Sequence, residues 1–292
     1  ASHYTLEDGC LSALLKKEET SPWPAPFEDV SLKATWAGWL PGDDPRAATN
    51  ISCLIERIGR GPGVLQSPLH EMYIGAPVIK AEEGVYTGML PGYTLAALTD
   101  VGHPDAAAAF DAIAWSASSS GNYQEYLIYD DHSGLTVFYN ASGLEPTDYT
   151  AKYRPWEGGI NAAAIMQYLV GLRPRAAQGH VSLRPHLPEG WPRMAFEGLR
   201  IGDERFDLEV LREAAEPPAG DSAITVILHS RAERDLDVSL RWDADAPRQI
   251  AVDDRPLPED QLTRREHFGA SSTETDGQRL PAGGTLRFQI FQ

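Results

Sequence analysis

The chain has 292 residues, of which 42 are acidic and 25 are basic, giving a formal net charge of −17. This charge opposes binding to nucleic acid or to an anionic membrane surface, and no run of about 18 apolar residues could span a bilayer. A length of 292 residues is typical of two domains. We also expect the protein to be soluble, with the cytoplasm as the favoured compartment.

Helical patterns dominate the first part of the chain. Asp44-Pro45 is typical of a helix start, with an N-cap followed by proline at the first helical position, and Gly59 ends the apolar stripe that follows. Cys53 lies among the apolar residues of this helix, which favours a buried thiol over a disulfide with Cys10. The predicted helices, in chain order, cover 4–17, 44–58, 91–101, 104–117 and 158–170.

Long connections separate these helices. A plain helix bundle uses connections of roughly 2–8 residues, whereas these are several times longer and rich in aromatic residues, which is typical of functional loops. One of them, 126–139, alternates like a small hairpin around 131–134. The turn between the second pair of helices is Gly102-His103-Pro104, so 91–117 is predicted to be a helical hairpin.

Short β-rich runs follow Gly179. We expect strands at 180–184, 195–200, 205–212, 222–229, 235–241, 247–252 and 285–291. Seven strands with turn residues between them favour an antiparallel sandwich, with 256–280 as an irregular surface excursion. The predicted domains are therefore a helical part, 1–175, and a β-domain, 176–292.

The order of these pieces resembles a known superfamily. Three segments carry the resemblance: Ser120-Gly121-Asn122-Tyr123-Gln124-Glu125-Tyr126, then Arg154-Pro155-Trp156-Glu157-Gly158-Gly159-Ile160-Asn161, then the junction Gly179-His180-Val181-Ser182-Leu183-Arg184-Pro185-His186. This order of segments is similar to the C-terminal part of six-hairpin glycoside hydrolases, such as the glucoamylase-like and rhamnosidase-like enzymes. The resemblance implies an α+β multidomain chain: the C-terminal part of an (α/α)6 barrel, an all-α toroid, followed by an antiparallel β-sandwich. A complete barrel of this type has twelve helices, so the resemblance also implies a missing N-terminal barrel half, on the same polypeptide or on another chain.

Two carboxylates are the candidate catalytic residues, because glycoside hydrolysis needs a pair of carboxyl groups. Glu125 comes first: it lies in a loop flanked by residues suited to hydroxyl binding, and the resemblance implies the role of general base. The alternative is a surface glutamate paired with an arginine. Glu157 comes second, since a carboxylate at a helix start also complements the helix dipole without any catalytic role.

Aromatic and polar side chains around these carboxylates are the candidate substrate-binding residues. Aromatic planes can stack on sugar rings, although core packing is the alternative reading. The candidates are Trp36, Trp39, Tyr86, Asn122, Tyr123, Gln124, Arg154 and Trp156. The histidines lack the spacing of a metal site, so we expect no metal and no cofactor.

These expectations combine into one functional hypothesis. The chain is predicted to serve a glycoside hydrolase that inverts the anomeric configuration and acts on a neutral oligo- or polysaccharide or glycoside. The alternatives are a carbohydrate phosphorylase or a polysaccharide lyase on the same toroid, and a non-catalytic glycan-binding or scaffold module. The expected partner is a carbohydrate, with neither nucleic acid nor a membrane involved.

Overall fold

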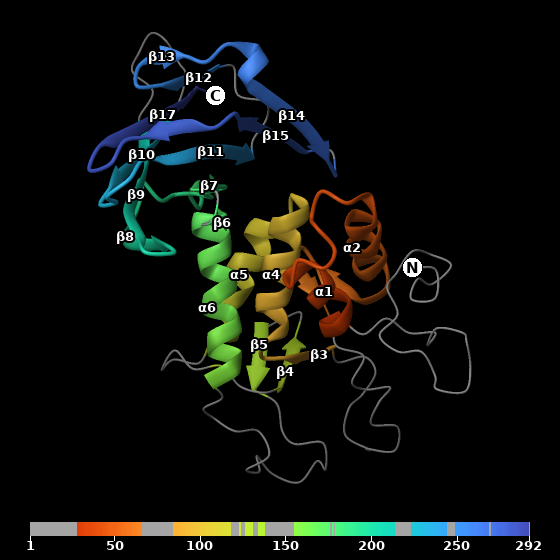
Figure 1. The fold of residues 1–292 in the computed structure, drawn as a ribbon. Coiled ribbons are helices and arrows are strands. Elements are labelled where there is room, and N and C mark those ends of the chain that lie inside the picture. Colours follow the sequence, from red (N-terminus) through yellow and green to blue (C-terminus); the bar gives the residue numbers. More distant parts are fainter. Residues whose placement is uncertain are drawn as a thin grey trace, which may run out of the picture. The chain divides into compact units, whose positions relative to one another are not determined.

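The computed structural model of the chain divides into two compact units, Ala1–Ile165 and Met166–Gln292. The structure describes residues 28–65, 84–117, 123, 126–130, 134–137, 155–175, 177, 179–213, 223–243, 249–268 and 270–291. Figure 1 shows the helices and strands with their labels. The helix predicted at 4–17 lies outside these ranges.

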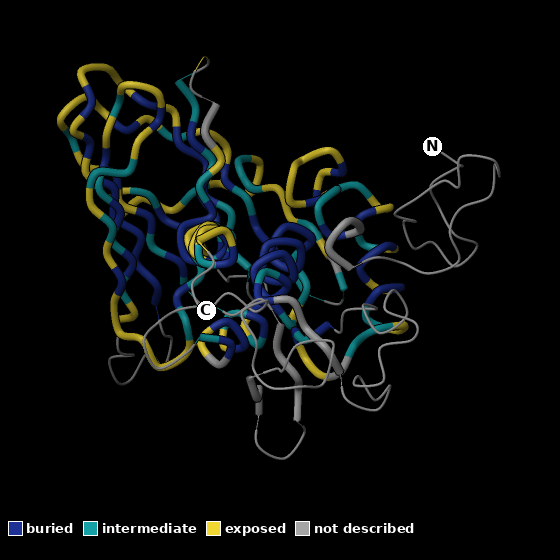
Figure 2. Tube along the Cα trace, turned by 90° about the horizontal axis from the view of Figure 1, so that it is seen from below, coloured by how far each residue is buried: buried dark blue, intermediate teal, exposed yellow. Residues whose placement is uncertain are grey.

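A buried helix forms the centre of unit 1. Every residue of α4 is buried, and Figure 2 colours the trace by burial. The helix α4 contacts α1, α2 and α5. Because α4 packs against neighbours on several sides, its apolar residues lie on nearly all of its faces instead of on a single face. The helices are α1 (Glu28–Trp36), α2 (Pro45–Ile58), α4 (Leu90–Val101), α5 (Ala106–Ser116) and α6 (Pro155–Val170), and α6 continues into unit 2.

The turn between α4 and α5 is the one the sequence predicted. Gly102 adopts a left-handed conformation with φ of 74°, and its N–H donates to Thr99 O at 3.2 Å. The N–H of His103 donates to Leu98 O at 2.9 Å. This pair of bonds is the Schellman ending of a helix, which satisfies the last carbonyl groups and needs a residue that tolerates positive φ.

The predicted start and end of α2 are also confirmed. Asp44 accepts a hydrogen bond from the backbone N–H of Arg46 at 2.9 Å, and Pro45 is the first helical residue. The helix ends before Gly59, as expected. The buried residues of α2 form one stripe: Ala47, Asn50, Ile51, Cys53 and Leu54.

Strands interrupt the helices of unit 1. The hairpin predicted at 126–139 is present, and its first strand pairs on its other side with a strand that leads into α4. These strands are β1 (Gly59–Gly61) and β2 (Val64–Leu65), which pair with each other, and β3 (Gly84–Thr87), β4 (Tyr126–Asp130) and β5 (Gly134–Val137), which form an antiparallel sheet in the order β3-β4-β5.

Unit 2 contains two six-stranded sheets. The first runs β13-β12-β17-β10-β9-β8, made of Arg255–Pro256, Gln249–Val252, Thr285–Phe291, Ala223–Ser230, Glu204–Glu213 and Arg193–Ile201. The second runs β14-β15-β11-β7-β6, made of Leu262–His267, Ala270–Thr275, Leu236–Asp243, His180–Leu183 and Arg173–Arg175, with β16 (Gln278–Leu280) also paired to β11. A short 3-10 helix, η3 (Glu259–Gln261), precedes β14.

The core of unit 2 follows from the period of two along its strands. In β9, β11 and β17 alternate residues are buried, which places one side-chain row inward and the other outward. The fully buried row includes Phe206, Leu208, Val238, Leu240 and Phe288. The outward row of β11 is polar, and this row supplies the charged network described below.

The predicted fold class is wrong. In the described ranges strands outnumber helices. The strand pair β1-β2 and the three-stranded sheet β3-β4-β5 separate the helices of unit 1, so the described helices are not an uninterrupted series of hairpins as in an all-α toroid. Nor is the β-part wholly antiparallel, since β7 pairs with β11 in parallel. The physical reason lies in the aromatic connections. The segment Gly84–Thr87 carries β-branched and aromatic residues and pairs as a strand with β4, whereas the sequence-based interpretation took it as part of a barrel loop.

Two smaller expectations are also wrong. The segment 256–280 holds β14, β15 and β16, and is therefore a regular part of the second sheet. Cys53 is disulfide-bonded rather than a buried thiol; the chain's other cysteine, Cys10, lies outside the described residues. In the described part of the chain no helix has the length and apolar character needed to cross a membrane.

Candidate functional site

The first turns of α6 carry the clearest group of candidate residues in unit 1. Glu157 and Asn161 are both fully buried, while Trp156 is 57% exposed. Residues four apart lie on the same face of a helix, so Glu157 and Asn161 share one face. The helix start also places Glu157 near the positive end of the helix dipole.

Asn161 connects α6 to the segment between β3 and α4. Its Nδ2 donates a hydrogen bond to Gly88 O at 2.8 Å. The fit is close: a Cβ added to Gly92 in α4 would lie 2.5 Å from Asn161 Oδ1 and 3.1 Å from Asn161 Cα. Glycine at 92 therefore lets α4 and α6 approach each other here.

The segment that contains Gly88 follows β3, and β3 pairs with β4, the strand that begins just after Glu125. Thr87, the last residue of β3, pairs with Tyr126, the first residue of β4. Gly88 follows Thr87 and accepts the bond from Asn161. The fold thus links the residue after Glu125, through one strand pair and one side-chain bond, to the face of α6 that carries Glu157.

Four of the predicted site residues lie outside the described residues: Asn122, Gln124, Glu125 and Arg154. Tyr123 is half-buried and forms an isolated bridge with Ala117, and burial raises the pKa of its phenol. Tyr86 belongs to β3 and pairs with Leu127. The predicted roles of all these residues remain predictions.

The remaining tryptophan candidates lie at the end of α1 and just after it. Trp36 is the last residue of α1, not a loop residue, and packs edge-to-face on Tyr93, with ring centroids 5.4 Å apart and planes at 81°. The Lys33 ammonium lies 5.3 Å from the centroid of the same tyrosine ring. Trp39 is 83% exposed, so most of its indole is available to a ligand.

The structure adds one residue that sequence reasoning did not select. In the sequence Asn161 stands out only as part of the motif that opens α6. Its signal was present in the spacing, since an amide four residues after Glu157 must lie on the same helix face. What the sequence could not give was the acceptor, Gly88, which is 73 positions away.

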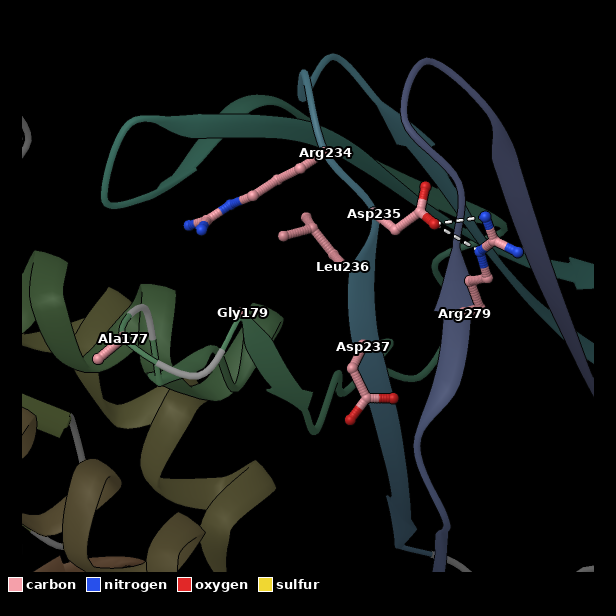
Figure 3. A pocket seen from close by; sticks show the side chains of 7 residues that line it. All are labelled: Ala177, Gly179, Arg234, Asp235, Leu236, Asp237 and Arg279. Carbon is pink, nitrogen blue, oxygen red and sulfur yellow. Dashed lines mark hydrogen bonds and ion pairs between the residues drawn. The ribbon is translucent and has the colours of Figure 1, made fainter.

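Unit 2 has a surface pocket of about 370 Å³ (Figure 3). Its charged side chains are already paired: Asp235 accepts from Arg279 Nε at 2.6 Å and from the N–H of Ala282 at 2.9 Å. Arg234 Nε lies 2.9 Å from Glu204 Oε1. None of the predicted site residues lines this pocket, which is formed by Ala177, Gly179, Arg234, Asp235, Leu236, Asp237 and Arg279.

A serine, a histidine and an aspartate meet beside that pocket. His180 Nδ1 lies 2.7 Å from Asp237 Oδ2, and His180 Nε2 lies 3.3 Å from Ser239 Oγ. Strand register explains the contact, because Asp237 pairs with His180 and Ser239 is the next residue on the same face of β11. A nucleophile, however, needs access to substrate and nearby oxyanion donors. Ser239 is only 5% exposed and lies inside a paired strand, so the contact is structural.

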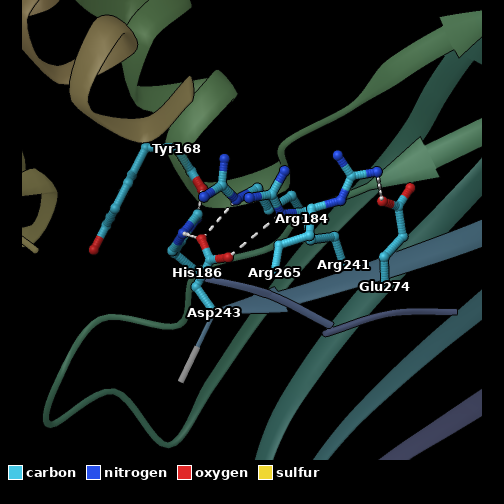
Figure 4. A network of polar contacts seen from close by, with 7 residues as sticks. All are labelled: Tyr168, Arg184, His186, Arg241, Asp243, Arg265 and Glu274. Atoms are coloured by element: carbon cyan, nitrogen blue, oxygen red, sulfur yellow. Dashed lines mark hydrogen bonds and ion pairs between the residues drawn. The ribbon is translucent and has the colours of Figure 1, made fainter. Parts of the chain in front are cut away.

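A second polar network lies on the same face of this sheet (Figure 4). Asp243 accepts from Arg184 Nε at 2.5 Å and from His186 Nε2 at 2.9 Å. Burial favours the neutral acid and would raise the pKa of Asp243, but the bonds and charges of His186 and Arg184 hold it well below the usual value. Burial also lowers the pKa of Arg241 to about 10, helped by repulsion from Arg184.

Among the described residues, no three side chains of the His, Cys, Asp or Glu type come together as a metal site would require. No protein-family model matches the chain, and no curated protein is similar to it. A solved structure to which the chain is similar is Ara127N-Se, a GH127 β-L-arabinofuranosidase from Geobacillus stearothermophilus T6, at 9% identity and a TM-score of 0.28. The match covers 99% of this chain and 36% of that chain. A TM-score this low carries no argument about fold or activity.

Proposed function

We propose that the chain contributes to the active site of a glycoside hydrolase that acts on a neutral oligo- or polysaccharide or glycoside. One observation carries the proposal: the Thr87–Tyr126 pair and the Asn161–Gly88 hydrogen bond connect the segment that follows Glu125 to the helix face that bears Glu157. The link supports one site shared by the segment of the proposed general base, Glu125, and the helix start at Glu157. Glycoside hydrolysis also needs a second carboxyl group as general acid.

The surroundings of Glu157 support a sugar ligand. Trp156 exposes more than half of its surface beside Glu157, and a Cβ added to Gly158 or Gly159 would meet nothing within 4 Å. The helix surface there is open, next to an aromatic ring on which the apolar face of a sugar could pack. The net charge of −17 also favours a neutral ligand over an acidic one.

In this proposal Glu125 is the general base and Glu157 holds its part of the site in place. A base must accept the proton of the attacking water, and in an inverting enzyme the two carboxyl groups stand about 6.5–9.5 Å apart so that the water fits between them. Glu157, fully buried in the first turn of α6, is suited to bind a sugar hydroxyl or to fix the helix start. The general acid of the reaction is a separate group that the proposal leaves unassigned.

The test compares Glu125→Gln with Glu157→Gln in the whole protein. Glutamine keeps the shape of the side chain but cannot accept the proton, so Glu125→Gln should lower kcat about 10²–10⁴-fold with a much smaller change in KM. Activity is measured as reducing-sugar release from neutral oligosaccharides and as phenol release from a panel of aryl glycosides. Glu157→Gln is the matched control and should weaken binding or stability more than kcat.

Each result decides between stated alternatives. If Glu125→Gln keeps its activity while Glu157→Gln loses it, the base is Glu157. Turnover that requires inorganic phosphate would identify a phosphorylase, and an unsaturated product a lyase.

A non-catalytic glycan-binding module is the second candidate, and the 83% exposure of Trp39 favours it because an exposed indole is itself a platform for sugar. Binding of neutral oligosaccharides that Trp39→Ala and Trp156→Ala weaken, without turnover of any substrate, would support this candidate and exclude the hydrolase.

A further inference from the structure

Charged side chains from neighbouring strands gather on the outward face of the second sheet of unit 2 (Figure 4). Strand register explains the grouping. Arg241 in β11 lies directly opposite Glu274 in β15. Two residues before Glu274, Ser272 is directly opposite both Asp243 in β11 and Arg265 in β14. Residues directly opposite each other in neighbouring strands point to the same side of a sheet, so these five side chains share one face.

The face carries more positive than negative charge. Arg184, which follows β7, donates from its Nε to Asp243 Oδ2 at 2.5 Å. Arg265 Nη2 lies 3.3 Å from Glu274 Oε2. Each carboxylate of the group is thus already paired with one guanidinium group, and Arg241 is the third cation. In this group of described residues three arginines share two carboxylates, which leaves one positive charge in excess.

Arg241 is the guanidinium group that has no close carboxylate. Its Nε lies 3.7 Å from Asp243 Oδ1, which is beyond hydrogen-bond distance. This nitrogen is enclosed and has no hydrogen-bond partner among the described residues. Only 14% of the side-chain surface is exposed, so water replaces a partner poorly. Burial and repulsion by Arg184 lower the pKa of Arg241 to about 10, as expected of a cation that lacks a counter-charge.

A small movement of Arg241 toward Asp243 would not remove the excess charge. Asp243 Oδ1 also lacks a hydrogen-bond partner in the described part of the chain, so the two atoms could approach each other. The carboxylate of Asp243 is nevertheless already bonded to Arg184, and two guanidinium groups would then share its single negative charge. A partly buried charge is stable only when it is paired, so a further anion would stabilise the group.

Ser272 provides a second and independent indication of a ligand. Its side chain is only 5% exposed, and its hydroxyl group has no hydrogen-bond partner among the described residues. A hydroxyl group that is buried without a partner destabilises the fold. Because Ser272 lies directly opposite Arg265, an oxygen atom placed between them would accept a hydrogen bond from the hydroxyl group and face the guanidinium group.

The group is closed toward β7 and more open toward β14. On the β7 side the ring of His186 stacks on the ring of Tyr168 in α6, with centroids 4.6 Å apart and planes at 10°. On the other side Arg265 keeps 35% of its side-chain surface exposed, in a strand that forms the edge of its sheet. A small ligand would therefore reach the group past Arg265.

We propose that this group is a binding site for the carboxylate of a small acidic ligand, held by Arg241 and Arg265 with a hydrogen bond from Ser272. The N–H groups of a planar guanidinium match the two oxygen atoms of a carboxylate. One carboxylate supplies the single negative charge that balances the three arginines, whereas a dianion such as phosphate would reverse the imbalance. The site lies in unit 2, and the proposal is independent of the proposed glycosidase activity.

Titration of the full chain with sodium acetate tests the proposal, with sodium chloride and sodium phosphate at equal ionic strength as references. NMR of the arginine side chains follows the Nε–H signal of Arg241 in the wild-type protein. We expect this signal to shift with acetate until it saturates, and to respond much less to chloride and phosphate. The formal net charge of −17 opposes unspecific accumulation of anions, so saturation would indicate a specific site.

Two variants and a matched control locate the site. Arg241→Gln removes the excess cation and should weaken acetate binding, measured by calorimetry, about tenfold or more. Ser272→Ala removes only the hydroxyl group and should weaken binding by a smaller factor. Arg279→Gln is the control, because Arg279 in β16 also belongs to this sheet but pairs with Asp235, outside the group. It should bind acetate like the wild type.

The wild-type NMR titration decides the proposal whether or not a variant folds. An Arg241 signal that does not respond to acetate overturns the proposal. Equal responses to acetate, chloride and phosphate would mean an adventitious ion only, and would overturn it as well. The same holds if Arg241→Gln binds acetate as tightly as the wild type.

Discussion

Gly92 and Gly159 both lie inside helices of unit 1, yet their surroundings differ. A Cβ on Gly92 would lie 2.5 Å from Asn161 Oδ1 and 3.0 Å from Ile160 Cγ2, whereas a Cβ on Gly159 would meet nothing within 4 Å. We expect Gly92→Ala to lower the free energy of unfolding by about 1–3 kcal/mol through overpacking. Gly159→Ala should raise it by about 0.5–1 kcal/mol, because alanine restricts the unfolded chain.

Urea unfolding of both variants checks this prediction. Each substitution adds one methyl group inside a helix. The difference between their changes in the free energy of unfolding therefore measures the effect of the close packing between α4 and α6. Equal effects of either sign would mean that the close approach of Gly92 to Asn161 does not contribute to stability.

At the residue scale, sequence reasoning succeeds where a side chain acts on its own neighbourhood. The cap at Asp44 and the left-handed Gly102 were both predicted, because each is determined by a few adjacent residues. The contacts of Asn161 with Gly88 and of His186 with Asp243 span 73 and 57 positions, and nothing in the local sequence indicates them. The predicted general base, Glu125, remains a prediction.

The start of α2 leads to a prediction at the scale of an element. The side chain and the backbone N–H of Arg46 both donate to Asp44, and they lower the pKa of that carboxyl to about 2 from 3.8. A carboxyl whose pKa is lower in the folded state stabilises the fold above its unfolded pKa and loses that effect as the pH falls. We therefore expect the first turn of α2 to loosen between about pH 4 and about pH 2.

Amide exchange or NMR titration of the first turn of α2 measures this loosening. Asp44→Asn is the control, since asparagine also caps helices but does not titrate, and its first turn should lack this acid transition. An unchanged transition in Asp44→Asn would assign it to another carboxyl group.

Elements were predicted well where one face is apolar and poorly where none is. All seven predicted strands of unit 2 are present within a few residues. Buried and more exposed residues alternate in β9 and β17, while β10 is a short apolar run that is buried almost throughout. The strand β14 was missed. It stands at the edge of its sheet, and a run such as Thr263-Arg264-Arg265-Glu266 has no buried row from which to recognise it. In unit 1 the hairpin β4-β5 was predicted because its strands are adjacent in sequence. The strand β3 was taken for a loop, since its pairing partner β4 is about 40 residues away.

At the scale of the whole molecule, the cysteines provide a direct test. No described cysteine is a free thiol, and Cys53 is disulfide-bonded in a chain that has two cysteines. We expect the unreduced, denatured protein to show no free thiol by a colorimetric thiol reagent. Reduction should lower the free energy of unfolding by about 2–4 kcal/mol, the usual contribution of a native disulfide.

Two titratable thiols in the unreduced protein would contradict this expectation. A disulfide is typical of oxidising compartments and rare in the cytoplasm. The cytoplasmic location that the sequence suggested stays a prediction.

The boundary between the two compact units falls inside α6, between Ile165 and Met166, and not in a loop. This position has a practical consequence for anyone who wishes to produce the units as separate recombinant fragments. A break there would leave unit 2 with Met166–Val170, five residues, which is far below the roughly 12–15 that an isolated helix needs to persist in water. Moving the break to either end of α6 would instead remove Tyr168 from unit 2 or Glu157 from unit 1. No single break therefore keeps α6 whole together with Glu157 in unit 1 and Tyr168 in unit 2. Recombinant fragments of this protein should each include a complete copy of α6.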